Sequence, residues 1–168
     1  MKAYPCLSVE KLEMLTRSNP EPDLAAIRAS VPLLRFHREL DSALEQHFQA
    51  YGLSRGRWYI LVQLYKNEGG LTPAELADQT GVSRAAVTGL VDGLVESGHV
   101  SRGEVGDDRR TYRVHLTPRG TDLIVSLLPD HLRRMQVLMQ ALSSSERQQF
   151  LGLLEKVHAR IPAFHHES

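Results

Sequence analysis

Four side chains near the start of one predicted helix have the sizes and charges that contact with DNA requires. They are Ser83, Arg84, Ala85 and Thr88. Arginine binds guanine edges or phosphates, and the hydroxyl groups of serine and threonine bind phosphates or bases. The small side chain of Ala85 permits close approach to the duplex and suits a thymine methyl group. These residue types indicate a helix in the major groove, although they leave open which side chain makes which contact.

Two further arginines lie at the tip of a predicted hairpin. Arg109 and Arg110 are placed to enter a minor groove, where narrow A·T-rich segments concentrate negative potential. Their neighbours Asp107 and Asp108 carry the wrong charge for contact with DNA. We expect one of these carboxylates to pair with a nearby arginine and fix the loop, which would hold the other arginine outward.

Two short helices around a tight turn, followed by a hairpin, must position these side chains. The segment Thr72–Glu75 has the pattern of a capping box with proline at the first helical position, and it predicts a helix that ends by Gly81. Ser83 can cap the next helix, and apolar residues recur along one side of that helix. Two segments that follow alternate in the manner of β-strands. The sequence thus predicts a recognition helix over 83–97 and a wing over 100–117.

Long helical stretches flank this central unit. Pro32 predicts that the first long helix begins or kinks near Ser30, and Pro129 predicts a kink or interruption in the last helical region. Neither flank can bury its apolar stripe alone, so a two-fold homodimer is the default expectation. The predicted class is mainly α with a small β-hairpin wing (α+β). The predicted parts are 1–53 (N-terminal extension and dimerisation helices), 54–120 (winged helix-turn-helix DNA-binding domain) and 121–168 (C-terminal dimerisation helices).

A resemblance to MarR-family transcriptional regulators is carried by GVSRAAVTGLVDGLVESGHVSR and the following DDRRTYRVHLTPRG, which look like that family's winged helix-turn-helix. The family's wing pattern is Asp-x-Arg and then an alternating strand that ends Leu-Thr-x-x-Gly. It matches Asp108, Arg110, Leu116, Thr117 and Gly120.

The resemblance implies an obligate dimer with a triangular outline. Such a dimer binds a pseudo-palindromic operator in double-stranded DNA and is often released by a small ligand or oxidant. By the same carry-over, Arg110 would be the wing-tip residue in the minor groove and Asp108 its structural partner. The recognition-helix positions would be held by Ser83, Arg84, Ala85 and Thr88. The predicted function is therefore a dimeric transcriptional regulator, in the form of a ligand-responsive repressor.

The charge balance weighs against a generally basic surface. Lys and Arg number 20 and Asp and Glu number 20, so the formal net charge is zero, whereas DNA-binding domains are usually basic. The alternative is therefore a winged-helix protein-interaction module without DNA binding. Against that alternative stand Arg84, Arg109, Arg110 and Arg113. The motifs G-x-S-x-G and HExxH, the P-loop and the glycine-rich dinucleotide turn do not occur, so we do not expect an enzyme.

Arg57, Trp58 and Tyr59 form a possible ligand pocket. They begin the helix beneath the predicted dimer module, where the resemblance places the family's pocket, and the expected effector is a small aromatic or phenolic compound. The urate-responsive branch of the family also has a tryptophan at this position, followed by an acidic residue. Tyr59 stands there in this chain, which argues against urate. The competing interpretation, that Trp58 belongs to the core, is favoured.

We expect no cofactor and no metal site. The 8 histidines show no ligand spacing such as HxxxH, so surface or capping roles are the default. Cys6 is the only cysteine, which rules out an intramolecular disulfide, and an incidental thiol is preferred to a redox sensor. The N-terminus lacks the apolar core of a signal peptide, and no apolar run is long enough to span a membrane. The expected location is the cytoplasm.

Overall fold

The computed structural model describes residue 14, residues 23–104 and residues 112–165. The helices are α2 (Leu24–Gln49), α3 (Arg55–Lys66), α4 (Pro73–Thr80), α5 (Arg84–Glu96), α6 (Pro118–Met139), α7 (Ser144–His158) and the short 3-10 helix η1 (Ile161–His165). The strands are β1 (Val100–Glu104) and β2 (Tyr112–Leu116), which pair antiparallel. This mainly α fold with one small hairpin confirms the predicted class.

The two long helices pass through their prolines. α2 begins at Leu24 and not near Ser30, because the Asp23 carboxylate accepts a hydrogen bond from the Ala25 amide at 2.9 Å and so caps the helix early. Pro32 then lies inside α2. α6 likewise continues across Pro129, so the predicted interruption is absent from this helix.

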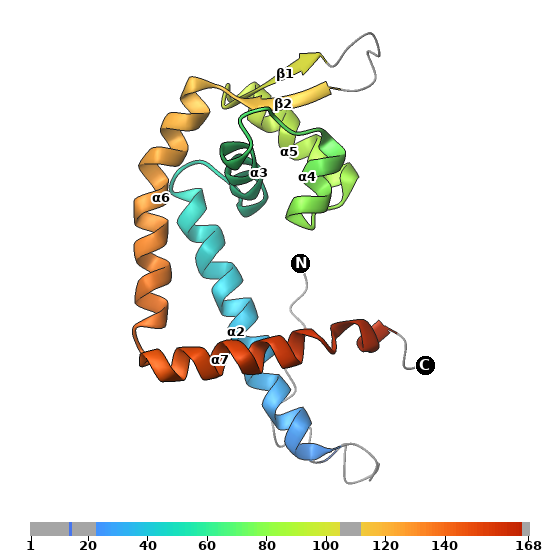
Figure 1. The fold of residues 1–168 in the computed structure, drawn as a ribbon, viewed down its shortest axis with the longest axis vertical. Coiled ribbons are helices and arrows are strands. Elements are labelled where there is room, and N and C mark those ends of the chain that lie inside the picture. The colour runs from blue at the N-terminus through green and yellow to red at the C-terminus, as the bar shows by residue number, and fades with distance from the viewer. Residues whose placement is uncertain (1–13, 15–22, 105–111, 166–168) are drawn as a thin grey trace.

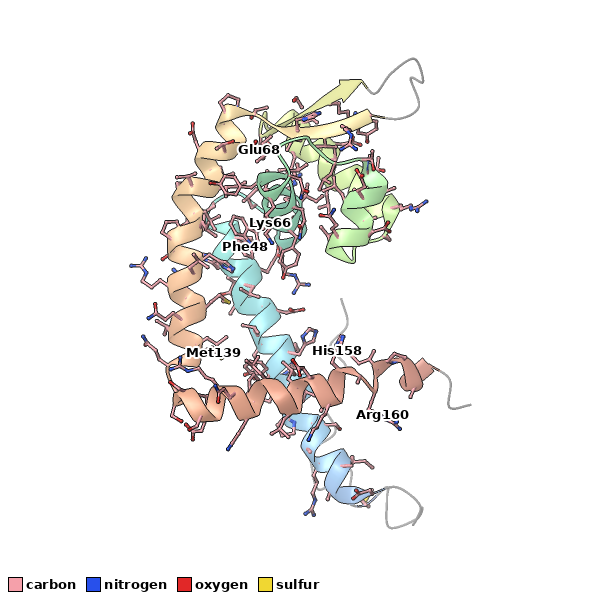
Figure 2. The ribbon with its side chains drawn as sticks, in the orientation of Figure 1. Phe48, Lys66, Glu68, Met139, His158 and Arg160 are labelled. Carbon is pink, nitrogen blue, oxygen red and sulfur yellow. The ribbon has the colours of Figure 1, made fainter. Side chains whose placement is uncertain are left out.

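The hydrophobic core lies where α3, α4, α5 and the sheet meet the C-terminal end of α2 and the N-terminal half of α6. Figure 2 marks Phe48 at the near end of α2, beside α3 and α6. Leu71, which precedes α4, bridges to Val114 on β2 through two backbone hydrogen bonds of 2.8 and 3.0 Å. The fully buried side chains include Phe48, Ile60, Leu61, Leu76, Val87, Val91, Leu94, Val114, Ile124 and Leu127.

The start of α6 is fixed tightly against the end of the recognition helix. The Thr117 hydroxyl accepts a hydrogen bond from the Gly120 amide at 3.1 Å and donates one to the Gly98 carbonyl at 2.7 Å. A Cβ atom on Gly120 would lie within 3.0 Å of the His99 carbonyl oxygen. The Leu-Thr-x-x-Gly pattern therefore has a physical basis here: threonine caps α6, and only glycine fits beside His99.

The remaining helices form arms that extend away from the core. α6 runs from the sheet to the far end of the molecule, where α7 lies across α2 (Figure 1). No residue of α7 is buried in the single chain. Large apolar side chains are exposed on all three arms: Leu33, Leu34 and Phe36 on α2, Val125, Leu132 and Val137 on α6, and Phe150, Leu151, Leu153, Leu154 and Val157 on α7. None of the helices in the described part of the chain is both long and apolar enough to cross a membrane.

Candidate nucleic-acid interface

The predicted helix-turn-helix is present, with the expected caps. The Thr72 hydroxyl accepts a hydrogen bond from the Glu75 amide at 3.2 Å, and the Glu75 carboxylate accepts one from the Thr72 amide at 2.7 Å. The hydrogen bonds that the Thr72 amide and the Thr72 hydroxyl donate to the carboxylate lower the pKa of Glu75. Gly81 ends α4 with φ of +68°, a conformation that favours glycine, and Ser83 caps α5 by accepting from the Ala86 amide at 3.3 Å.

Helix α5 has one buried side and one exposed side. Its buried residues are Val87, Val91 and Leu94. The predicted contact residues all lie on the exposed side or at the cap: Ser83, Arg84, Ala85 and Thr88. The Thr88 hydroxyl donates to the Arg84 carbonyl at 3.2 Å, whereas the Arg84 guanidinium has no ion pair with any residue described by the structure. The predicted wing-tip residues Asp108, Arg109 and Arg110 lie outside the described residues.

An arginine outside the predicted contact residues ties the wing to α5. Arg102 on β1 forms an ion pair with Asp92 on the exposed side of α5. Its guanidinium also lies over the Tyr112 ring of β2, 4.8 Å from the ring centroid. Asp92 thus has a cationic partner. The sequence signal for this pair was Asp92 itself. An acidic residue on the outer side of a helix that reads DNA needs a cationic partner.

Arg113 belongs to a second tie, between β2 and the start of α4. It donates to the Gly70 carbonyl at 2.6 Å and lies 3.6 Å from the Glu75 carboxylate. In the sequence, Arg113 is one of the arginines that favour DNA binding. In the structure its guanidinium makes these internal contacts, which hold the wing against the helix-turn-helix.

The three residues of the possible ligand pocket have different surroundings. Trp58 is 2% exposed and stacks on Phe48, with ring centroids 5.2 Å apart, in agreement with the core interpretation. Arg57 lies against Gly93 on α5, where its guanidinium occupies the space that a Cβ atom would need. Tyr59 is exposed on α3.

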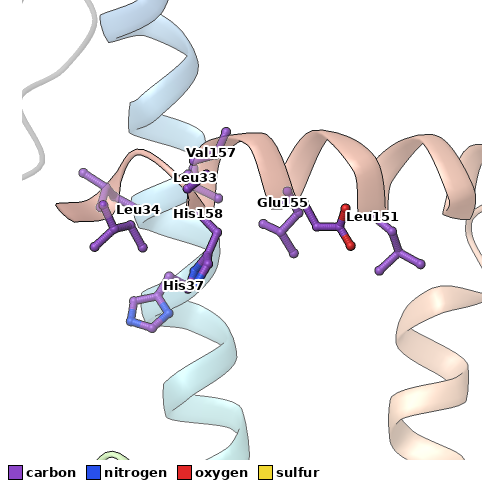
Figure 3. Close-up of a pocket in the computed structure, with 10 residues that line it drawn as sticks. Leu33, Leu34, His37, Leu151, Glu155, Val157 and His158 are labelled. Carbon is purple, nitrogen blue, oxygen red and sulfur yellow. The ribbon is translucent and has the colours of Figure 1, made fainter. Parts of the chain in front are cut away.

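An open apolar groove of about 560 Å³ lies elsewhere, between α2 and α7 (Figure 3). Leu33 and Leu34 line it from α2, and Leu151, Leu154 and Val157 line it from α7. Across the described residues, no three His, Cys, Asp or Glu side chains gather in an arrangement that could hold a metal ion.

The arrangement of α3, α4 and α5 with a two-stranded wing defines a winged helix-turn-helix protein. A family model described as "MarR family" matches residues 51–111. The HTH-type transcriptional repressor YetL of Bacillus subtilis (strain 168) is 30% identical over 143 residues, which cover 84% of this chain and 86% of YetL. This chain belongs to the MarR family of transcriptional regulators.

Other relatives and solved structures agree. The transcriptional repressor MprA of Escherichia coli (strain K12) is 29% identical over 114 residues, which cover 67% of this chain and 65% of MprA. A structure titled as the S. aureus MepR–DNA complex has a TM-score of 0.70 at 21% identity, over 79% of this chain and 96% of that one. At this identity the likeness shows the fold alone. Members of the family are transcriptional regulators and not enzymes, and they bind DNA and act as dimers.

Proposed function

We propose that this chain forms a homodimer that represses transcription by reading a pseudo-palindromic operator. Helix α5 with its cap, residues 83–97, enters the major groove, and the wing, residues 100–117, reaches the minor groove. The observation that carries the proposal is the outward side of α5. Small and polar side chains face solvent there together with Arg84, which has no ion pair with a described residue, while the opposite side of the helix is buried in the core.

The recognition helix is assigned Ser83, Arg84, Ala85 and Thr88 as contacts. Arg84 supplies a cation for a guanine edge or a phosphate, and Ala85 leaves room for the backbone to approach. The free amide groups at the N-terminus of α5 can also bind a phosphate of the DNA backbone. Because Asp92 and Glu75 are both paired with arginines, their charges are partly neutralised, which helps a chain of zero net charge to bind DNA.

The wing is assigned Arg109 and Arg110 in the minor groove, with Asp108 fixing the loop. The support is the pattern Asp-x-Arg in the sequence and the rigid attachment of the wing strands by Arg102 and Arg113. A wing that keeps its angle to α5 can place an arginine in the groove next to the one that α5 reads.

The dimer is assigned to the three arms. A single chain leaves their apolar side chains exposed and an open groove between α2 and α7, and contiguous patches of this kind mark interaction sites. We keep the division into 1–53, 54–120 and 121–168 as part of this proposal, with the outer parts joining two copies.

A small aromatic or phenolic effector completes the proposal. Because Trp58 is already packed in the core, such an effector would contact Arg57 or Tyr59 from outside. A thermal-shift screen with phenolic and aromatic acids tests this part, since a ligand of the folded state raises the unfolding temperature.

A DNA titration at several salt concentrations tests the function itself. Binding to the operator, sought first in the protein's own promoter region, should weaken with a slope of about 0.9 per phosphate contact on logarithmic axes. A protein-interaction module would instead bind no fragment in a salt-dependent way, and that result would remove the proposal.

Replacement of Arg110 by alanine should weaken operator binding by about 1–3 kcal/mol and leave the dimer intact, because one well-placed groove contact is lost. The matched control is Arg160→Ala, which removes the same charge at the opposite end of the molecule from the wing (Figure 2). Equal affinities of the two variants would mean that the wing does not reach the groove. Fluorescence anisotropy with a labelled operator measures both.

A further inference from the structure

Two histidines stack where the arms join the DNA-reading unit. His47 lies near the end of α2 and is 8% exposed, and His131 lies on α6. Their ring centroids are 5.5 Å apart and their planes differ by 15°. His47 Nε2 and His131 Nδ1 are both buried, and neither has a hydrogen-bond partner among the described residues. The proposed function does not use this pair.

Aromatic rings surround the pair. Phe48 lies 5.0 Å from His47 and 5.3 Å from His131, measured between ring centroids. Tyr51 meets His47 edge-on at 5.6 Å, and Trp58 of α3 meets His131 edge-on at 5.4 Å. The pair therefore sits inside packing that involves α2, α3 and α6, and any change in its volume or charge acts on all three.

The charged groups near the pair come mainly from α6. The Asp130 carboxylate lies 3.7 Å from His47 Nδ1, but it also accepts hydrogen bonds from Arg133 at 2.5 Å and Arg134 at 2.8 Å. These arginines lower the pKa of Asp130 to about 2. Burial and then Arg134 disfavour a proton on His47 and lower its pKa, whereas the Asp130 carboxylate favours a proton on His47 and on His131 and offsets part of that effect.

Just after the end of α2, the Tyr51 hydroxyl donates a hydrogen bond to the Asp130 carboxylate at 3.4 Å. From α3, Trp58 is the ring in contact with the pair, and Arg55 at the start of that helix is ion-paired with Asp41 of α2. Among the contacts just described, α2 and α3 therefore bring no second carboxylate into contact with either imidazole ring.

The uncharged state of the two rings is the one that fits. Burial lowers the pKa of His47 and the pKa of His131, and a proton on His47 further disfavours one on His131. A histidine whose folded-state pKa lies below its ordinary 6.5 contributes its packing fully above pH 6.5. That contribution is lost as the pH falls from 6.5 through the folded-state pKa. The reason is that the histidine in the unfolded chain has the higher pKa and binds a proton first.

A metal ion does not suit the pair. Imidazole lone pairs lie in the ring planes, and in nearly parallel stacked rings those planes do not converge on a common point. Zinc sites in proteins also need about four ligands. No third ligand completes a site among the described residues.

We propose that His47 and His131 form an acid-sensitive latch between the arms and the DNA-reading unit. While both rings are neutral, they stack and hold α2 and α6 against α3. Protonation separates them, the spacing between the two recognition helices of the dimer is no longer fixed, and the operator is released. This inference rests on the proposed DNA binding for its last step only.

Trp58 provides the first test, because it is the only tryptophan and lies edge-on to His131. Its fluorescence, followed from pH 8 to pH 5 in the intact protein, should change reversibly with a midpoint below 6.5. The change should be absent from His131→Gln, which keeps a polar side chain but cannot titrate. Emission that does not change with pH in the wild-type protein would overturn the latch.

Operator affinity at constant ionic strength provides the second test. Between pH 7.5 and pH 5.5 the wild-type protein should lose at least about tenfold in affinity, which corresponds to one pKa unit in one coupled group. His131→Gln should lose less than about twofold. The matched control is His99→Gln, since His99 also has a pKa lowered by burial but bonds to Ser97 at the wing root. This control should behave like the wild type, and an equal loss in His131→Gln would contradict the proposal.

Nuclear magnetic resonance of the wild-type imidazole groups covers the case in which His131→Gln does not fold. The two histidines of the pair should titrate below 6.5 together with the Trp58 signal, and ordinary pKa values for both would refute the latch. Absence of operator binding at pH 8 would count against the proposed function instead, and the fluorescence and resonance titrations would still decide the latch.

Discussion

Replacement of Leu154 by glutamate is expected to convert the dimer to monomers and to lower operator affinity by about 10²–10⁴-fold. The affinity falls because two linked reading heads bind far more tightly than one. Leu154 is 42% exposed in the single chain and lines the groove between α2 and α7. A carboxylate buried there by a second copy would lack a partner, which is costly. Sedimentation velocity and a DNA titration on the same sample measure the two effects.

The fold of the single chain should survive this substitution. No residue of α7 is buried, so the DNA-reading unit does not depend on that helix for its core. Gln149→Glu is the matched control, because it introduces the same side chain and the same change in charge at an exposed position of α7 that does not line the groove. If Leu154→Glu remained dimeric, the interface would have to lie on other surfaces than the one proposed.

Replacement of Gly120 by alanine is expected to destabilise the protein by about 3 kcal/mol, near the upper end for an overpacked site. The added methyl group would collide with the His99 carbonyl oxygen, and the Thr117 hydrogen bonds to the Gly98 carbonyl and the Gly120 amide hold the backbone on both sides in place. A side chain could turn aside, but here the end of α5 and the start of α6 would have to separate. Urea unfolding followed by circular dichroism measures the change.

Gly89→Ala is the control for Gly120→Ala. It makes the same substitution in a helix, but a Cβ atom on Gly89 meets nothing within 4 Å. Alanine should therefore stabilise α5 by about 0.5–1 kcal/mol through helix propensity. Opposite signs for the two variants would establish that the close approach at His99, and not helix propensity, explains the glycine in the Leu-Thr-x-x-Gly pattern. Similar effects would leave that explanation without support.

Local patterns in the sequence determined the central unit. The caps at Thr72 and Ser83, the apolar stripe of α5 and the alternation around Val114 each depend on residues close together in the chain, and all have the predicted form. The effect of the two prolines on the helices was predicted less well. Pro32 was expected to place the start or a kink of a helix near Ser30, and Pro129 to kink or interrupt another. Instead α2 begins at Leu24, where Asp23 caps it, and α2 and α6 both continue across their prolines.

Contacts between distant segments were decided by the tertiary structure alone. The sequence could not reveal that Arg113 turns toward Gly70 and Glu75, or that Arg102 meets Asp92 and Tyr112, because these pairings depend on how the hairpin docks on the helices.

The stacked histidines illustrate the same limit most clearly. His47 and His131 are far apart in sequence and follow no ligand spacing, so the sequence alone predicted ordinary surface or capping roles for them. Only the meeting of α2, α3 and α6 buries His47, partly buries His131 and leaves a nitrogen of each without a hydrogen-bond partner among the residues that the structure describes. Residue types and spacing thus determined which elements form and which side of α5 faces outward. The burial that changes the chemistry of a histidine arises from packing between helices, and local sequence does not encode it.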